Sequence, residues 1–338
     1  MPKLSVIIPI YNVEKYLRKC LDSVIEPAVD IIKSNRMPDY EIIAVNDGST
    51  DSSAEIAAEY EARFPGFFRL ISTENQGQGH ARNVGIELSQ ADYLYFIDSD
   101  DYLVEGGMNN IMSTLDKDFD ILIFDSVTVN TDYEELEYRR GCGREGEINL
   151  DSYPELLLDG PDVWNKIFRR RLFIDSGIRF TCRVWFEDLR TVPKLYALTD
   201  KIVYIPQAWH RYLQRPGSVT NMKCIERNLE IIPAVDELLE FYYSGKYAQS
   251  HRDVLEYLAF RSEFLTSSVR ANLADYRTPV QDELISDFLV KHPDYAQNPY
   301  FKTMGRNHRL LTSLLLRRNY LAVHLLMKAN NLVKNKKL

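Results

Sequence analysis

The sequence contains few cysteines and no long apolar segment. Four cysteines are scattered over 338 residues, and none forms a C-x-x-C pair. This spacing argues against a zinc site and is typical of a reducing compartment, where thiols stay unpaired. The apolar run at residues 4–10 is far shorter than the about 18 residues that span a bilayer. We therefore expect a cytoplasmic protein without a membrane-spanning helix.

Acidic residues are missing from the C-terminal part of the chain. The whole sequence carries 41 Lys and Arg against 49 Asp and Glu, a net charge of −8. Nine of the basic residues and none of the acidic ones follow Asp294, so the first 294 residues carry −17. The acidic body and the lack of a basic, aromatic strand platform argue against nucleic acid as a partner.

Two familiar nucleotide-binding signatures are also missing. The loop at 76–85, Q-G-Q-G-H-A-R-N-V-G, leads into a helical pattern, yet it has neither the G-x-G-x-x-G nor the Walker form. This argues against a dinucleotide or P-loop ATP site. Backbone amides at such a helix start still attract anions, and Arg82 can recognise a phosphate or a base edge with two N–H groups.

Short apolar runs alternate with helical patterns over the first 130 residues, and we expect strands at 4–10, 40–45, 67–72, 93–97 and 121–129. Among the helices between them, one is expected to be capped by Asn12 and another to open with a capping box of Ser52 and Glu55. The alternation predicts an α/β fold with a largely parallel sheet. The polar segment 131–149 is expected to be a loop.

The second half of the chain is increasingly helical. Two short strands are expected at 201–205 and 208–213, followed by long helices at 225–243, 251–272 and 279–290. We place a boundary at residue 222, which divides an α/β domain, 1–222, from a helical region, 223–338, with a basic tail at 302–338. Two Leu-rich helices in the tail, 310–316 and 321–327, are expected to be separate, with Asn319 capping the second.

Polar residues follow three of the predicted strands, at 11–12, 46–47 and 98–101. Ligands bind at the carboxyl ends of strands in such sheets. The three carboxylates within 98–101 repel one another unless a cation neutralises them, and oxygen ligands suit Mg²⁺ or Mn²⁺. A helix N-cap cluster is the alternative. Asp47 could accept the N3–H of a uracil or serve only the turn.

Four segments together resemble the inverting family 2 glycosyltransferases of the GT-A fold. They are S-V-I-I-P-I-Y-N at 5–12, V-N-D-G-S-T-D at 45–51, N-Q-G-Q-G-H-A-R-N-V-G at 75–85 and F-I-D-S-D-D-Y-L at 96–103. Their order and spacing match, and the resemblance covers about residues 3–220. It implies transfer of a sugar from a nucleotide-sugar, with a UDP-sugar as the expected donor, to a saccharide or lipid-linked saccharide in surface polysaccharide biosynthesis.

The resemblance also assigns roles within the donor site. It implies that Asp47 binds the uracil, that Tyr11 lies near its ring and that Arg82 lies by the base or diphosphate. Asp98 would lie towards the ribose and is also a candidate metal ligand, and Asp100 would bind the Mn²⁺ or Mg²⁺ that bridges the diphosphate. The other positions expected around the donor are Pro9, Asn12, Glu14, Asn46, Gly77, Ser99, Arg211, Arg215 and Ser218.

A base and one further metal ligand complete the implied site. Glu187-Asp188 matches the family's E-D motif, so Asp188 is expected to deprotonate the acceptor hydroxyl and Glu187 to orient it; carboxylates that merely favour a helix start are the alternative. His210 could also ligate the metal, or it could be a buried strand histidine beside Trp209. Lys166, in a W-N-K segment that family members share, could be structural or could bind the acceptor.

The basic, Leu-rich tail can lie on an anionic membrane surface or pack on the protein body. A lipid-linked acceptor would make residence at the inner face of the cell membrane sensible, and a homo-oligomer is compatible with the sequence. Two other function classes stay open at this stage. One is a non-catalytic module that binds nucleotide-sugars, and the other is a Mg²⁺-dependent phosphotransferase with Asp98 as nucleophile.

Overall fold

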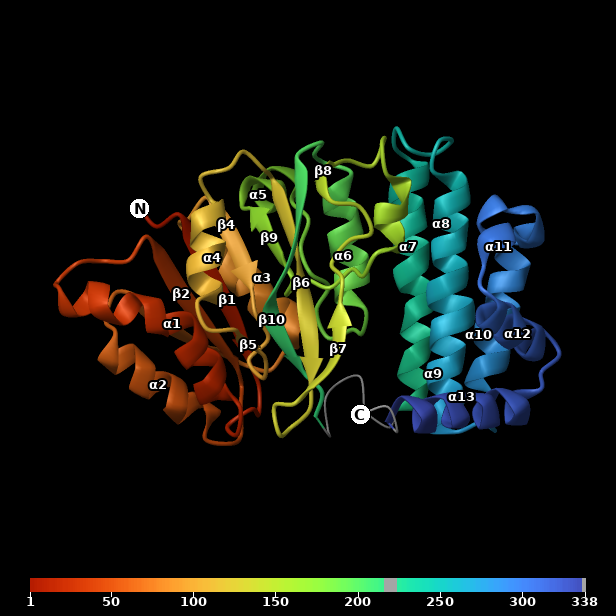
Figure 1. Ribbon diagram of the computed structural model, residues 1–338, viewed down its shortest axis with the longest axis horizontal. Helices are drawn as coiled ribbons and strands as arrows, with labels where there is room; N and C mark the ends of the chain where they lie inside the picture. Colours follow the sequence, from red (N-terminus) through yellow and green to blue (C-terminus); the bar gives the residue numbers. More distant parts are fainter. Residues whose placement is uncertain (216–223, 336–338) are drawn as a thin grey trace. The chain divides into compact units, whose positions relative to one another are not determined.

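The computed structural model describes residues 1–215 and 224–335 (Figure 1). The chain divides into two compact units, Met1–Arg215 and Pro216–Leu338, each described here by itself. The expected domain boundary at residue 222 and the candidate Ser218 lie outside the described residues.

A ten-stranded mixed sheet forms the centre of the N-terminal unit. The strands are β1 (Leu4–Ile10), β2 (Tyr40–Asp47), β3 (Phe68–Thr73), β4 (Tyr93–Phe96), β5 (Tyr102–Leu103), β6 (Ile121–Val129), β7 (Glu135–Arg139), β8 (Gly146–Ile148), β9 (Lys166–Arg169) and β10 (Ile202–Leu213). Their order is β3-β2-β1-β4-β9-β6-β10-β5, with β7 beside β6 and β8 beside β10. β3, β2, β1 and β4 run parallel, as do β6 and β10, while β9 runs antiparallel between β4 and β6. The predicted α/β fold with a largely parallel sheet is confirmed.

Helices cover both faces of this sheet. They are α1 (Leu17–Lys33), α2 (Ser53–Arg63), α3 (Gln78–Leu88), α4 (Gly107–Thr114), α5 (Arg171–Ser176), α6 (Glu187–Tyr196) and the 3₁₀ turn η1 (Pro154–Leu158). Val6 and Ile8 of β1 share a buried cluster with Leu21 of α1. Ile7, which points to the other face because side chains alternate along a strand, meets α3. A Cβ at Gly85 would lie 2.3 Å from Ile7 Cγ2, so glycine lets α3 approach β1.

The C-terminal unit is helical throughout its described residues. Its elements are η3 (Ile225–Glu230), α7 (Ile231–Tyr243), α8 (Arg252–Ala259), the π-helix η4 (Phe260–Ser267), α9 (Ser268–Ala274), α10 (Val280–Lys291), η5 (Tyr295–Gln297), α11 (Pro299–Thr303), α12 (Arg306–Leu316) and α13 (Tyr320–Asn335). The two separate tail helices are confirmed, because Asn319 Oδ1 caps α13 by accepting from Ala322 N–H at 3.2 Å. Among the described helices, none is both long enough and apolar enough to cross a bilayer.

Several local predictions are wrong. α1 begins at Leu17 rather than after Asn12, whose φ is 51° and whose side-chain oxygen accepts from Thr50 N–H instead. Ser52 precedes α2 without a side-chain capping bond. The segment 131–149, predicted as a loop, contains β7 and β8, and the two strands expected at 201–213 form one strand, β10, with register shifts after Ile205.

Candidate active site

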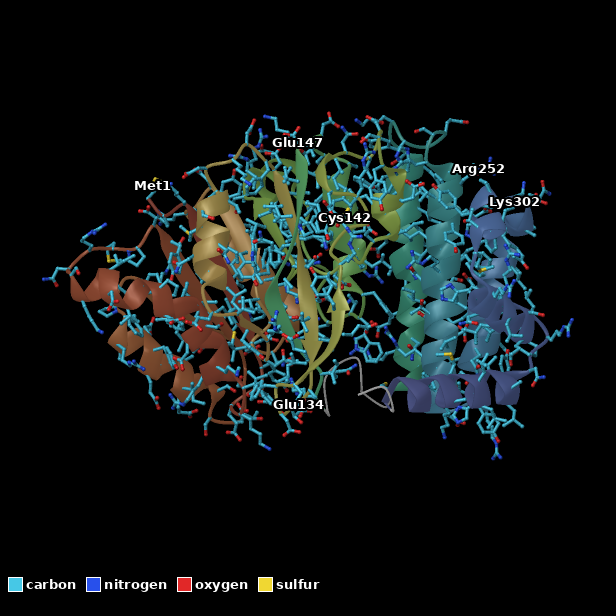
Figure 2. The ribbon with its side chains drawn as sticks, viewed as in Figure 1. Met1, Glu134, Cys142, Glu147, Arg252 and Lys302 are labelled. Atoms are coloured by element: carbon cyan, nitrogen blue, oxygen red, sulfur yellow. The ribbon has the colours of Figure 1, made fainter. Side chains whose placement is uncertain are left out.

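The predicted site residues gather at the carboxyl edge of the sheet. Glu134, in the turn after β6, marks this edge in Figure 2, and Glu147 of β8 marks the opposite one. β1, β2 and β4 all end at this edge because they run parallel to one another. The polar segment that follows each strand therefore lies at the same edge. This edge therefore brings together side chains that are up to about 200 residues apart in sequence.

The three carboxylates after β4 have different surroundings. Asp98 Oδ1 accepts from Arg82 Nη2 at 2.8 Å, and Asp100 Oδ2 accepts from Arg215 Nε at 2.7 Å. Both remain partly exposed, and each keeps one oxygen outside these contacts. Burial and then the charge of Asp98 raise the pKa of Asp100, although Arg215 offsets part of that rise. A cation between Asp98 and Asp100 would relieve this repulsion.

Asp101 belongs to a buried structural network with His210. Asp101 Oδ1 accepts from Leu213 N–H at 2.7 Å, and its Oδ2 lies 2.8 Å from His210 Nε2. The other ring nitrogen of His210 lies 3.1 Å from Tyr95 Oη, and Trp164 stacks on the ring at 4.5 Å. Burial lowers the pKa of His210 to about 3. Because both ring nitrogens are occupied and the side chain is fully buried, His210 is left out of the metal site proposed below.

The described residues suit a metal that takes few protein ligands. No group of three or more His, Cys, Asp and Glu side chains is arranged as a metal site within residues 1–215 and 224–335. Mg²⁺ usually takes one or two carboxylates and completes its shell with substrate phosphates. The available oxygens of Asp98 and Asp100 fit that pattern, whereas a closed, all-protein site does not.

Asp47 anchors the loop that precedes α3. Its Oδ1 accepts from Gln76 N–H at 2.9 Å and its Oδ2 from Gly77 N–H at 2.7 Å. Gly77 has a φ of +86°, a conformation that favours glycine. The Asp47 side chain is almost completely buried, so in this structure it positions the loop, and only its remaining lone pairs could meet a ligand.

The turn after β1 is tied to the turn after β2. Asn12 Oδ1 accepts from Thr50 N–H at 2.8 Å, and Glu14 Oε2 accepts from Ser52 N–H at 3.0 Å. Tyr11, next to these contacts, is exposed. Two residues predicted to lie around the donor instead have structural roles. Pro9 is buried within β1, and Asn46 Oδ1 accepts from Ser49 N–H at 3.0 Å. The pairing leaves the Tyr11 ring available to a flat ligand.

Arg82 lies at the centre of the site and joins two motifs. Its Nη1 donates to Glu187 Oε1 at 2.7 Å, and its Nη2 donates to Asp98 Oδ1 at 2.8 Å. Gln78, which the sequence reasoning missed, also donates to Glu187 Oε1, at 2.5 Å. The guanidinium is nearly fully buried. A buried charge with two partners is expensive to disrupt, so Arg82 fixes the E-D motif beside the carboxylates that follow β4.

Asp188 lies at the start of α6, next to Glu187. It is only partly buried, and its Oδ1 accepts from Leu189 N–H at 2.8 Å. Burial, followed by the negative charges of Glu187 and Asp162, raises the pKa of Asp188 to about 7. Phe186, just before it, has a φ of 63°, a strained value for an aromatic residue. A carboxyl that gains and loses its proton near neutral pH suits a general base.

Lys166 and Arg211 are both engaged in contacts within the protein. Lys166 Nζ is fully buried and donates to Gly160 O, Asp162 O and Asn165 Oδ1 at 2.6–3.0 Å. With three acceptors, this ammonium has no donor left for an acceptor sugar, which favours the structural alternative. Arg211 Nη2 donates to Glu135 Oε1 at 2.8 Å, whereas Arg82 and Arg215 donate to the carboxylates after β4.

Comparison with known proteins matches the family model described as Glycosyl transferase family 2 to residues 5–185. Over 278 residues the chain is 29% identical to glycosyltransferase GlyA of Streptococcus pneumoniae, covering 75% of this chain and 37% of GlyA. It is 32% identical over 234 residues to the minor teichoic acid biosynthesis protein GgaB of Bacillus subtilis, covering 66% of this chain and 24% of GgaB. The chain thus spans well under half the length of these two curated relatives.

Two solved structures share the fold. The S. aureus TarS 1–349 structure in complex with UDP-GlcNAc matches with a TM-score of 0.56 and 21% identity, over 87% of this chain and 92% of that one. The mannosyltransferase PcManGT from Pyrobaculum calidifontis, in complex with GDP-Man and Mn²⁺, matches with a TM-score of 0.53 and 15% identity, over 96% and 86%. At these identities the likeness concerns the fold alone.

Proposed function

Because the chain belongs to glycosyl transferase family 2, we propose that it is an inverting glycosyltransferase that moves a sugar from a UDP-sugar to a hydroxyl of a saccharide or lipid-linked saccharide acceptor. Family membership favours a glycosyltransferase over the non-catalytic module and the phosphotransferase. The UDP-GlcNAc bound to TarS supports the donor class. The teichoic acid role of GgaB supports an acceptor in surface polysaccharide assembly.

The donor would lie along the carboxyl edge. In this proposal the uracil meets Tyr11 and the loop that Asp47 anchors, and the diphosphate lies near Asp98, Asp100 and Arg215. Asp98 and Asp100 would hold Mn²⁺ or Mg²⁺, as the Mn²⁺ in the PcManGT structure also suggests. Bound there, the metal would stabilise negative charge on the departing diphosphate. Arg215, already 2.7 Å from Asp100, would add positive charge beside the same group.

The proton transfer falls to Asp188. The acceptor hydroxyl attacks the anomeric carbon on the face opposite the leaving UDP, so the new bond has inverted configuration, and the hydroxyl proton goes to the Asp188 carboxylate. Glu187, held by Arg82 and Gln78, positions Asp188 through their shared helix start. The observation that carries this proposal is the Arg82 bridge, because one guanidinium brings the predicted base motif and the predicted metal motif together.

The proposal can be tested by separating donor binding from transfer. Nucleotide release from a panel of UDP-sugars with Mn²⁺, read as released UDP, identifies the donor. Asp188→Asn should lower kcat by about 10²- to 10⁴-fold, the range typical of a general base. Calorimetry should show UDP and Mn²⁺ bound as in the wild type.

The matched variant is Asp100→Asn, which should weaken UDP binding in Mn²⁺ because it removes a proposed metal ligand. Wild-type transfer by Asp188→Asn would eliminate Asp188 as the base. Unchanged Mn²⁺-dependent UDP affinity in Asp100→Asn would eliminate the metal assignment.

A further inference from the structure

The last two helices of the C-terminal unit expose apolar side chains that the described residues of this unit leave uncovered. α12 buries Leu311 and Leu315, and α13 buries Val323. These side chains already provide the core-facing stripe of each helix. The leucines left outside are Leu310 at 48%, Leu316 at 38%, Leu321 at 50% and Leu325 at 59% exposure. A helix that only packs on its own unit does not need this second apolar stripe.

These leucines lie on both sides of the turn between α12 and α13. Leu316 ends α12, and α13 begins at Tyr320 after three intervening residues, with Leu321 and Leu325 one turn apart on a single face. Arg318 fixes this turn by pairing with Asp282 Oδ1 at 3.1 Å. α13 itself is held where it crosses the ends of α9 and α10 (Figure 1), because Asn272 Nδ2 donates to Tyr320 O at 3.0 Å. The exposed stripe is therefore held in place by the fold.

Basic side chains lie beside this stripe, and the one acidic side chain paired at the turn, Asp282, is bound to Arg318. Arg309 lies seven residues before Leu316, on the same side of α12, and Arg317 and Lys328 flank the leucines of α13; all three are exposed. No acidic residue follows Asp294 in the sequence. We call the surface formed by Arg309, Leu316, Arg317, Leu321, Leu325 and Lys328 the basic leucine face.

We propose that the basic leucine face docks this glycosyltransferase onto an anionic lipid bilayer. An interfacial helix needs apolar side chains that enter the acyl boundary beside basic side chains that meet the headgroups, and this face supplies both. A symmetric dimer through the face would bring two patches of positive charge together, because a two-fold interface pairs identical patches. Docking goes beyond the sugar transfer proposed above and would bring the enzyme to a lipid-linked acceptor.

The test is flotation of the full-length protein with vesicles. The wild type should float with vesicles of phosphatidylcholine and phosphatidylglycerol, and it should stay at the bottom with phosphatidylcholine alone or in high salt. Leu321→Glu with Leu325→Glu should reduce the floating fraction about tenfold, because the variant replaces two side chains that insert into the bilayer with negatively charged ones that the anionic lipid repels. Arg309→Gln with Arg317→Gln should reduce it less and remove most of its salt dependence.

Val290→Glu is the matched control. Val290 is an exposed apolar residue at the C-terminal end of α10, whereas Asp282, which pairs with Arg318, lies at the N-terminal end of the same helix. Flotation of this variant should be unchanged. Unchanged melting temperatures show that the variants fold.

Wild-type protein that does not float with anionic vesicles would overturn the proposal, as would Leu321→Glu/Leu325→Glu protein that floats normally. Light scattering that finds a wild-type dimer split by the same double variant, without lipid binding, would overturn it in favour of self-association. Release of UDP is measured separately, so failure of docking leaves the catalytic proposal intact.

Discussion

The two units bury ionisable side chains in opposite ways. In the N-terminal unit, Arg82 has Glu187 at 2.7 Å and Asp98 at 2.8 Å. In the C-terminal unit, Glu263 of η4 is fully buried, and the side chain that hydrogen-bonds with it is another carboxyl, Asp287. A buried charge that has partners of opposite charge can stay ionised, whereas a buried carboxyl that faces another carboxylate is driven to bind a proton. The N-terminal unit thus holds the charged Arg82 in place between two carboxylates, whereas the C-terminal unit keeps the carboxyl of Glu263 neutral.

The surroundings of Glu263 explain its protonation. Burial, and then the negative charge of Asp287, raises the pKa of Glu263 to about 9. Lys291 lowers this pKa only in part, because its ammonium already lies 2.7 Å from carboxylate oxygens of both Asp236 and Asp287. The π-helical turn of η4 thus carries a neutral carboxyl at physiological pH.

Removing the Arg82 guanidinium should have the largest effect on stability and on transfer. Arg82→Met leaves Glu187 and Asp98 without their shared partner, so we expect the free energy of unfolding to fall by about 3–5 kcal/mol. Transfer should fall by about a hundredfold or more, because the base motif loses its position. Denaturant unfolding and kcat measure the two effects. Arg82→Lys should restore little, since an ammonium cannot form the forked contact, and restoration by Lys would show that charge alone matters.

Glu263 should make the stability of the protein depend on pH. Because the folded-state pKa of about 9 lies above the unfolded value near 4.5, the wild type loses stability as pH rises from about 4.5 to about 9, by at most about 1.4 kcal/mol per pH unit. Glu263→Gln should remove this slope, because glutamine resembles the protonated acid. Melting temperatures between pH 6 and pH 9 check it. The exposed Glu240→Gln of α7 is the control, and an equal slope in both variants would refute the protonated Glu263.

An exposed pair should have the smallest effect. Arg18 Nη2 lies 2.7 Å from Glu59 Oε2, and both side chains are about half exposed. Water screens such a pair, so Arg18→Ala should change the free energy of unfolding by less than about 1 kcal/mol. A loss as large as that of Arg82→Met would mean that burial does not decide the cost of removing an arginine in this protein.

The sequence predicts the sheet and its ligand-binding edge well, since buried parallel strands read as continuous apolar runs and polar residues follow them. It fails where side chains bond across long sequence distances. The Asn12 amide serves the turn at Thr50 rather than a helix, and His210 packs with Tyr95 and Asp101, more than 100 residues away. β7 is missed because its alternation is short: only Leu136 and Tyr138 alternate with charged residues, over five largely exposed positions.

Site prediction shows the same division. The motifs single out Arg82, Asp98 and Glu187 as candidate site residues, because each lies within a recognisable segment. They do not give the bridge among them, since that contact depends on how α3 and α6 approach the end of β4. Gln78 lies within the segment at 75–85, but the resemblance assigns it no role, and only its position one turn before Arg82 in a helix could have suggested a shared partner.

If Asp188 acts as a base whose pKa is set by burial and by Glu187, the pH dependence of kcat/KM should follow the protonation of this carboxyl. Since the deprotonated carboxylate is the active form, kcat/KM should rise with pH and level off above an inflection near pH 7. Glu187→Gln removes the neighbouring negative charge while keeping an acceptor for Arg82, so its inflection should move to lower pH. A wild-type profile without an inflection between pH 5.5 and 8.5, or an inflection that Glu187→Gln leaves in place, would contradict the account.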